Sequence, residues 1–129
     1  MAVTHTTAAR DAATNAVTAL IGASGNLTFR LTGTVGAPGA VVATLPLSAT
    51  AFASSSTGTA TANAISSDTN AAGNASPVAN AALQTSGATL VIHCAVAASA
   101  SDINMTNGLT ITAGDTVTCT SLTYTALSA

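Results

Sequence analysis

The sequence predicts a mainly β domain, an antiparallel β-sandwich or jelly-roll-like fold, with one N-terminal α-helix. Helical periodicity is confined to the start of the chain, and after Gly25 the apolar residues recur at every second position. Seven or eight strand-like runs then follow at fairly even spacing between turn residues, a pattern typical of sandwiches and jelly rolls. We therefore divide the chain into a helical arm, residues 1–25, and a β-sandwich domain, residues 26–129.

The first expected element is a helix over residues 6–21. Thr6 or Thr7 can cap its start, and Gly22 suits its end. Its apolar residues recur at steps of three and four on one face: Ala9, Ala13, Ala16, Val17, Leu20 and Ile21. Because most of this face is alanine, the stripe is shallow, and we expect the helix to lie on the domain or on a neighbouring molecule.

The strand that follows the helix should be half-buried. Leu27 and Phe29 fall on one face, whereas Thr28 and Arg30 fall on the other, which we expect to point outward. The later expected elements are strands over 40–48, 58–65, 78–85 and 88–97, with Pro46 near a strand end or edge, Phe52 as a core anchor and a long surface loop over 67–77.

The C-terminal segment predicts a hairpin over residues 109–127, turning around Ala113–Asp115. In its second arm Val117 and Cys119 share one parity, whereas Leu122 and Tyr124 share the other. One register cannot bury all four on one face, so we expect a β-bulge or a change of face near residues 120–121.

Charge is unusually scarce along the chain. Charged residues make up 5% of the 129 positions, against roughly a quarter in an ordinary soluble domain, and there is no lysine and no glutamate. The formal net charge is −2, and no basic stripe exists, so we expect no nucleic-acid partner. No signal peptide and no membrane-spanning run is visible, so we expect synthesis in the cytoplasm and no membrane partner.

No catalytic or metal-binding constellation is apparent. His93 and Cys94 are adjacent in an expected strand, so they point to opposite faces and cannot both bind one ion. The aspartates are expected to order turns, and we expect no cofactor, no metal and no enzymatic activity. Cys94 and Cys119 should be reduced in the cytosol, although a disulfide between them is possible if their strands are neighbours.

The outward positions of the expected strands carry mainly threonine, alanine and serine. Such a face can be covered by another protein without burying an unpaired charge, which would cost several kcal/mol. The surface therefore indicates a structural protein that associates with itself and with other proteins. Arg30 is a candidate for an intermolecular salt bridge, with a solvated arginine as the alternative. The candidate contact residues are Arg10, Val17, Leu20, Arg30 and Tyr124.

Three segments carry a family resemblance: "MAVTHTTAARDAATNAVTALI", "ATLPLSATAFASSSTGTATANAI" and "GLTITAGDTVTCTSLTYTA". In this order they resemble small virion proteins of tailed bacteriophages that are encoded among the head genes. The resemblance implies a head decoration, or cement, protein on the outer surface of the capsid. Such a protein bridges copies of the major capsid protein and would associate with itself as a homodimer or homotrimer.

Two alternatives stay open beside the cement protein. One is a structural component of the phage tail or baseplate. The other is a carbohydrate-binding β-sandwich module, although that function needs exposed aromatic side chains for stacking on sugars. The chain has only three aromatic residues, Phe29, Phe52 and Tyr124.

Overall fold

The computed structural model describes residues 3–34 and 37–127 and begins with the expected helix, α1 (Thr7–Ala19). Thr6 caps its start, and its hydroxyl accepts a hydrogen bond of 3.2 Å from the backbone N–H of Ala9. The helix ends at Leu20, and Gly22 follows with a φ of +69°, a value that glycine adopts without strain. Both predicted end signals are therefore confirmed.

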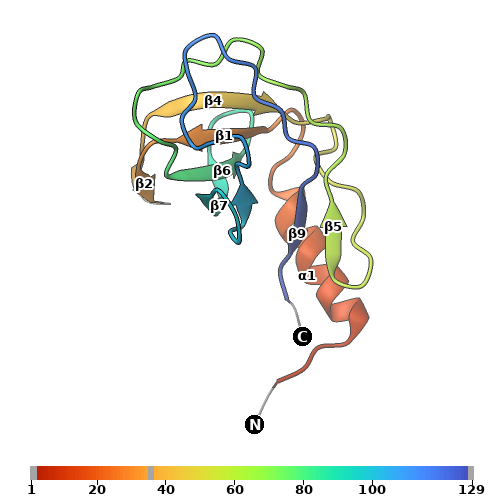
Figure 1. Cartoon of the computed structure of the whole chain (residues 1–129). Helices are drawn as coiled ribbons and strands as arrows, with labels where there is room; N and C mark the ends of the chain where they lie inside the picture. The colour runs from red at the N-terminus through yellow and green to blue at the C-terminus, as the bar shows by residue number, and fades with distance from the viewer. Residues whose placement is uncertain (1–2, 35–36, 128–129) are drawn as a thin grey trace.

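A curled five-stranded sheet forms the centre of the molecule (Figure 1). Its strand order is β4-β1-β6-β7-β8, and all pairs are antiparallel except β7 with β8. The strands are β1 (Asn26–Arg30), β4 (Val41–Pro46), β6 (Asn80–Gln84), β7 (Leu90–Ala97) and β8 (Ile103–Asn104). Pro46 is the last residue of β4, as expected of a proline that cannot donate to a continuing ladder.

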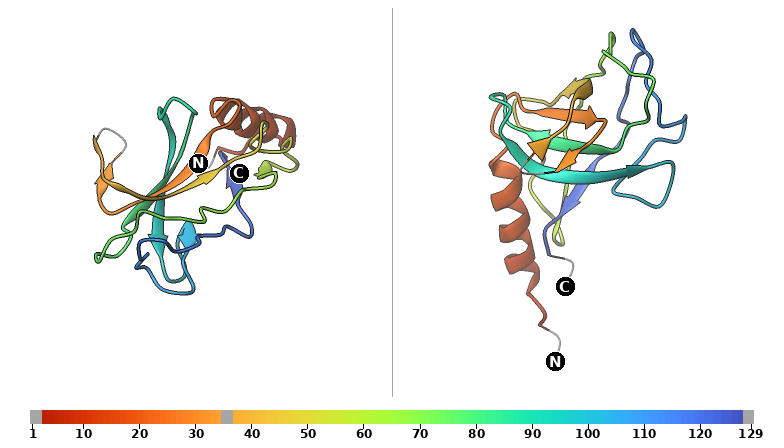
Figure 2. Two further views of the ribbon diagram at one scale, coloured as in Figure 1. Left: turned by 90° about the horizontal axis from the view of Figure 1, so that it is seen from above. Right: turned by 90° about the vertical axis from the view of Figure 1, so that its left-hand side faces the viewer.

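Two short ladders complete the strands of the described residues. One joins β2 (Gly33–Thr34) to β3 (Ala37–Pro38), and the other joins β5 (Thr59–Thr61) to β9 (Thr123–Thr125). The helix packs beside β5 and β9 and extends away from the sheet, so both chain ends point to the same side of the molecule (Figures 1 and 2).

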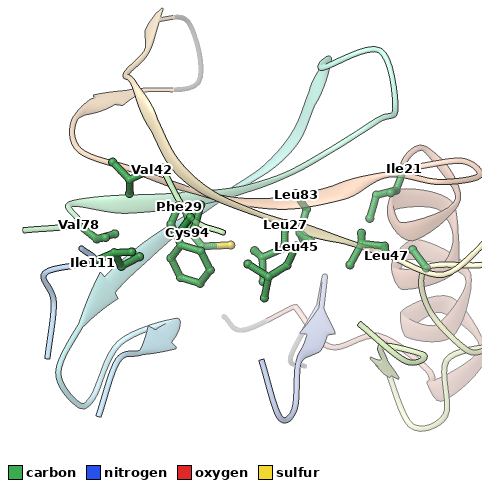
Figure 3. Packing of buried hydrophobic residues seen from close by; sticks show 14 of the residues in the cluster. Ile21, Leu27, Phe29, Val42, Leu45, Leu47, Val78, Leu83, Cys94 and Ile111 are labelled. Carbon is green, nitrogen blue, oxygen red and sulfur yellow. The ribbon is translucent and has the colours of Figure 1, made fainter. Parts of the chain in front are cut away.

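The hydrophobic core lies on one face of the sheet. Leu27, Phe29 and Leu45 point to this core face from adjacent strands (Figure 3). The segment near residues 109–125 contributes Ile111 from the other side, and Val78, two residues before β6, packs in the same core (Figure 3). The sheet and these covering segments make a β-sandwich-like domain, so the predicted mainly β fold with one N-terminal helix is confirmed.

The prediction that β1 is half-buried is wrong. Thr28 and Arg30 are buried as fully as Leu27 and Phe29 on the opposite face. The guanidinium of Arg30 donates to the carbonyl of Gly39 at 2.7 Å and to the side-chain oxygen of Gln84 at 2.9 Å. Gln84 lies opposite Asn26 in the register, four residues before Arg30 on β1. The arginine side chain therefore lies along the sheet over Thr28, and this contact encloses the second face.

The predicted hairpin over residues 109–127 is also wrong. The turn at Ala113–Gly114 exists, but its two arms pair with other segments: the N–H of Asn74 donates to Ile111, and Val117 pairs with Asp68. The segment 67–77 is consequently a pairing segment, and Ala71 within it is buried.

The predicted change of face is confirmed. Val117 and Cys119 are half-buried at alternate positions, residues 120–121 are both exposed, and Leu122 and Tyr124 are half-buried at the opposite parity. Two successive exposed residues therefore let all four side chains reach the core.

Candidate functional site

Polar side chains on the inner face of α1 make hydrogen bonds to the turn before β5. The Asp11 carboxylate accepts hydrogen bonds of 2.7 Å from both the Ser55 hydroxyl and the Gly58 backbone N–H. Asn15 accepts the Ser55 backbone N–H at 2.8 Å. Thr57 in this turn has a φ of +53°, which is unfavourable for a β-branched residue, so the helix contacts hold a strained loop in place.

Thr14 is the central residue of this contact and is 0% exposed. Its hydroxyl donates to the carbonyl of Gly58 at 2.6 Å and accepts the backbone N–H of Ala126 at 3.1 Å. One side chain thereby joins α1 to the turn before β5 and to the residue after β9. The hydrogen bonds that Asp11 accepts lower the pKa of its carboxyl, chiefly the bond from the Ser55 hydroxyl and then the bond from the Gly58 N–H.

The outer face of α1 is apolar and exposed. Ala9, Ala12 and Ala16 are exposed along it, and Leu20 at its end is 65% exposed. The predicted apolar stripe is thus divided: Ala9, Ala16 and Leu20 are exposed, whereas Val17 is half-buried and Ile21 is buried. The packed stripe contains Arg10, Thr14, Val17 and Ile21, together with Asp11. Hydrogen bonds to the body hold the helix with its polar side inward, which a hydrophobic pattern made mostly of alanine could not reveal.

The five predicted contact residues lie in three environments. Leu20 is exposed, whereas Arg10 and Val17 are half-buried on the inner side of α1. Tyr124 is half-buried in β9, beside the same helix, and packs against the core. Arg30 lies apart from them and is only 7% exposed, so the expected outward position of Arg30 is corrected by its hydrogen bonds within the sheet.

A shallow groove of about 470 Å³ follows the helix. Asn15 and Thr18 form one side, and residues 49–54 form the other, with buried Phe52 beneath them. Its lining is mostly alanine, serine and threonine and includes no ionisable side chain, so it supplies no acid, base or nucleophilic thiol.

All four aspartate carboxylates accept hydrogen bonds from the backbone. The sequence predicted this role only for turns. Each accepts at least one backbone N–H: Asp11 from Gly58, Asp68 from Thr44 and Asn70, Asp102 from Ala95, and Asp115 from Thr112. Asp68 and Asp102 thereby serve strand edges as well as turns. The acidic side chains hold the backbone of the fold together.

The two cysteines are separate thiols. Cys94 is buried, and burial, with a smaller contribution from Asp102, raises its pKa to about 11. Cys119 is half-buried, and burial raises its pKa as well. Both thiols are therefore protonated near neutral pH. The part of the chain that the structure describes contains no cluster of three or more histidine, cysteine or acidic residues able to hold a metal ion.

None of the three aromatic residues is fully exposed. Phe29 and Phe52 are buried in the core, and Tyr124 is half-buried against it.

No described helix has the length and apolar character needed to cross a bilayer. Comparison of the chain with protein families, with curated proteins and with solved structures finds no match.

Proposed function

We propose that this chain is a structural virion protein, a capsid decoration or cement protein that binds the outer surface of the shell formed by the major capsid protein. The order of the three sequence segments that resemble phage head proteins supports this proposal. The proposed class of function is structural association, since the exposed side of α1 carries alanine and leucine instead of charged residues.

The orientation of α1 is the single observation that carries the proposal. The helix turns Asp11 and Thr14 toward the body and presents Ala9, Ala16 and Leu20 outward. Exposed apolar patches on soluble proteins commonly mark surfaces that bind other proteins. Covering this face requires no desolvation of a charge, so each contact contributes its burial term of about 25 cal/mol per Å².

Binding at many equivalent positions on a capsid would compensate for the weakness of each single contact. A decoration protein binds at many equivalent positions, and oligomers engage several of them at once, which raises the effective affinity without new contacts. In this proposal self-association as a dimer or trimer lets each oligomer span the joint between capsid subunits. The chain would be made in the host cytoplasm and would end on the outer surface of the virion.

Particles with and without the chain test the proposal. We expect mass spectrometry to find the protein in the head fraction, and particles that lack it to release DNA at a lower temperature or milder osmotic shock. Ala16→Glu adds a charge to the outer face of α1 and should reduce binding to the particles. Ala98→Glu, at an exposed position in the β7–β8 loop, is the matched control and should bind normally.

Two results would overturn the cement role. Equal rupture temperatures with and without the chain would show that it does not stabilise the shell. Recovery of the protein only in tail fractions would place it in the tail or baseplate, the alternative structural role.

A further inference from the structure

A groove lies between the two arms of the C-terminal loop, and we name it the terminal slot. Its arms are residues 102–111 and 115–123, joined by the turn at 112–115, and Phe29 of β1 contributes to its lining. The turn is closed by hydrogen bonds from the Thr112 N–H to the Asp115 carboxylate at 2.9 Å and from the Asp115 N–H to the Thr112 carbonyl at 3.0 Å. The slot has a volume of about 610 Å³.

The lining of the slot is mostly polar, but it includes a row of partly exposed apolar side chains. Ile103 and Met105 on the first arm pack against the core, and so do Val117, Cys119 and Leu122 on the second, yet all five remain partly exposed. The slot is therefore an edge of the hydrophobic core where one more layer of chain would remove apolar surface from water.

The second arm also presents an unpaired backbone edge. Val117 pairs with Asp68, and the Leu122 carbonyl accepts the Ala62 N–H at 2.8 Å. Between them, Thr118, Cys119 and Thr120 make no backbone–backbone hydrogen bond to any residue in 3–34 or 37–127. Side chains from 116 to 120 alternate between exposed and half-buried, the period of an extended strand. An exposed edge of this kind is a template for a further strand.

Charge determines which strand fits. Asp102 and Asp115 lie in the slot, whereas its lining includes no arginine, lysine or histidine. Each carboxylate uses one oxygen, Oδ2, for a backbone N–H, at 2.9 Å in both cases. The complementary occupant therefore carries cationic side chains. A second copy of this chain does not fit, because it has no lysine, Arg30 is buried in its own sheet and Arg10 lies on the inner side of α1.

We propose that the terminal slot binds an extended segment of another protein, with apolar residues alternating with polar ones and at least one arginine or lysine. The segment would pair with the backbone of residues 118–120, place its apolar side chains on the partly exposed core edge and direct its cation to Asp102 or Asp115. This inference concerns the slot alone and holds whether or not the chain is a virion protein.

Titration with defined peptides tests the inference. The probe is a blocked seven-residue peptide of alternating valine and threonine with an arginine at each end. We expect it to shift the amide NMR signals of residues 118–120. It should slow hydrogen exchange at Thr118 and Thr120, whose N–H groups point away from the edge that Val117 uses for Asp68. The same peptide with glutamate ends should bind more weakly. A peptide with proline at its centre should bind more weakly, because proline cannot donate to a carbonyl of the slot edge.

Matched variants separate the slot from general acidity. Asp102→Asn with Asp115→Asn keeps an oxygen for each backbone N–H but removes both charges. It should weaken binding of the arginine peptide by about 1.5- to 5-fold for each ion pair lost, the range for exposed ion pairs, and abolish the preference over the glutamate peptide. Asp11→Asn changes a backbone-bonded aspartate on α1, outside the slot, and should leave binding unaltered.

Three results would overturn the inference. They are no shift of residues 118–120 at millimolar peptide, equal binding of the arginine and glutamate peptides, and occupation of the slot by a second copy. The last would appear as concentration-dependent shifts of these amides without peptide.

Discussion

Replacing Thr14 with valine tests whether hydrogen bonds hold α1 with its polar side toward the body of the domain. Valine has nearly the same shape and the same β-branched stiffness, so packing and helix propensity change little. The substitution removes the donor to the Gly58 carbonyl at 2.6 Å and the acceptor for the Ala126 N–H at 3.1 Å. Both backbone groups lose their partner at a site where Thr14 itself is fully buried.

The expected loss follows from these two groups. A buried polar group without a partner costs about 1–3 kcal/mol, so two partly enclosed groups give about 2–4 kcal/mol. This is a large part of the roughly 5–15 kcal/mol that stabilises a typical domain. Thr18→Val is the matched control, because the Thr18 hydroxyl bonds only carbonyls of its own helix, those of Thr14 at 3.1 Å and Asn15 at 3.3 Å. Its cost should stay within about 0.5 kcal/mol.

Urea unfolding followed by circular dichroism gives the free energy of unfolding for both variants, and hydrogen exchange reports the Ala126 amide directly. We expect Thr14→Val to lower the midpoint and to speed exchange of that amide, whereas Thr18→Val does neither. If the two variants lie within about 0.5 kcal/mol of each other, the hydrogen bonds do not hold the helix in place and the reasoning fails.

Two further predictions concern the loss of stability at low pH and the close approach of Gly73 to the turn at Ala113. Because the pKa of Asp11 is lowered, its contribution is present above the ordinary aspartate value of about 3.9 and is lost as the pH falls through the lower folded value. Thermal unfolding from pH 6 to 2 should therefore show a smaller acid loss for Asp11→Asn, and an unaltered acid limb would contradict this. Gly73 and Gly22 both have positive φ, but a Cβ at Gly73 would lie 2.3 Å from the Ala113 nitrogen, whereas none of the described atoms lies within 4 Å at Gly22. In calorimetry Gly22→Ala should cost about 1–2 kcal/mol, and Gly73→Ala about 1–3 kcal/mol more; equal losses would show that the close approach is unimportant.

The features that could be predicted from the sequence depend on neighbouring residues. Thr6 as a helix cap and Gly22 as a stop act within one turn of the helix. The change of face at residues 120–121 follows from parity along a single segment. In each case the residues that decide the conformation stand next to one another in the chain.

The features that were missed depend on distant partners. Arg30 is buried because Gln84, 54 residues later, accepts its guanidinium. The inner face of α1 is fixed by Thr14 and Gly58, 44 residues apart. One signal was present: Asp11, Thr14, Asn15 and Thr18 form a polar stripe at steps of three and four, opposite the alanines. Alanine contributes little burial energy, so this stripe was as informative as the apolar one.

Under the proposed function, the two faces of α1 have different roles, one in stability and the other in association. Its inner face makes the hydrogen bonds through Asp11 and Thr14, whereas its outer face at Ala16 and Leu20 makes none of them. A polar-to-apolar change at Thr14 should therefore destabilise the fold and leave the outer surface intact. A charge at Ala16, two residues further along, should leave the fold intact and prevent covering of the helix. Since the chain uses its few charges to bind its own backbone, the surface left over is one that a neighbouring protein can cover at little electrostatic cost.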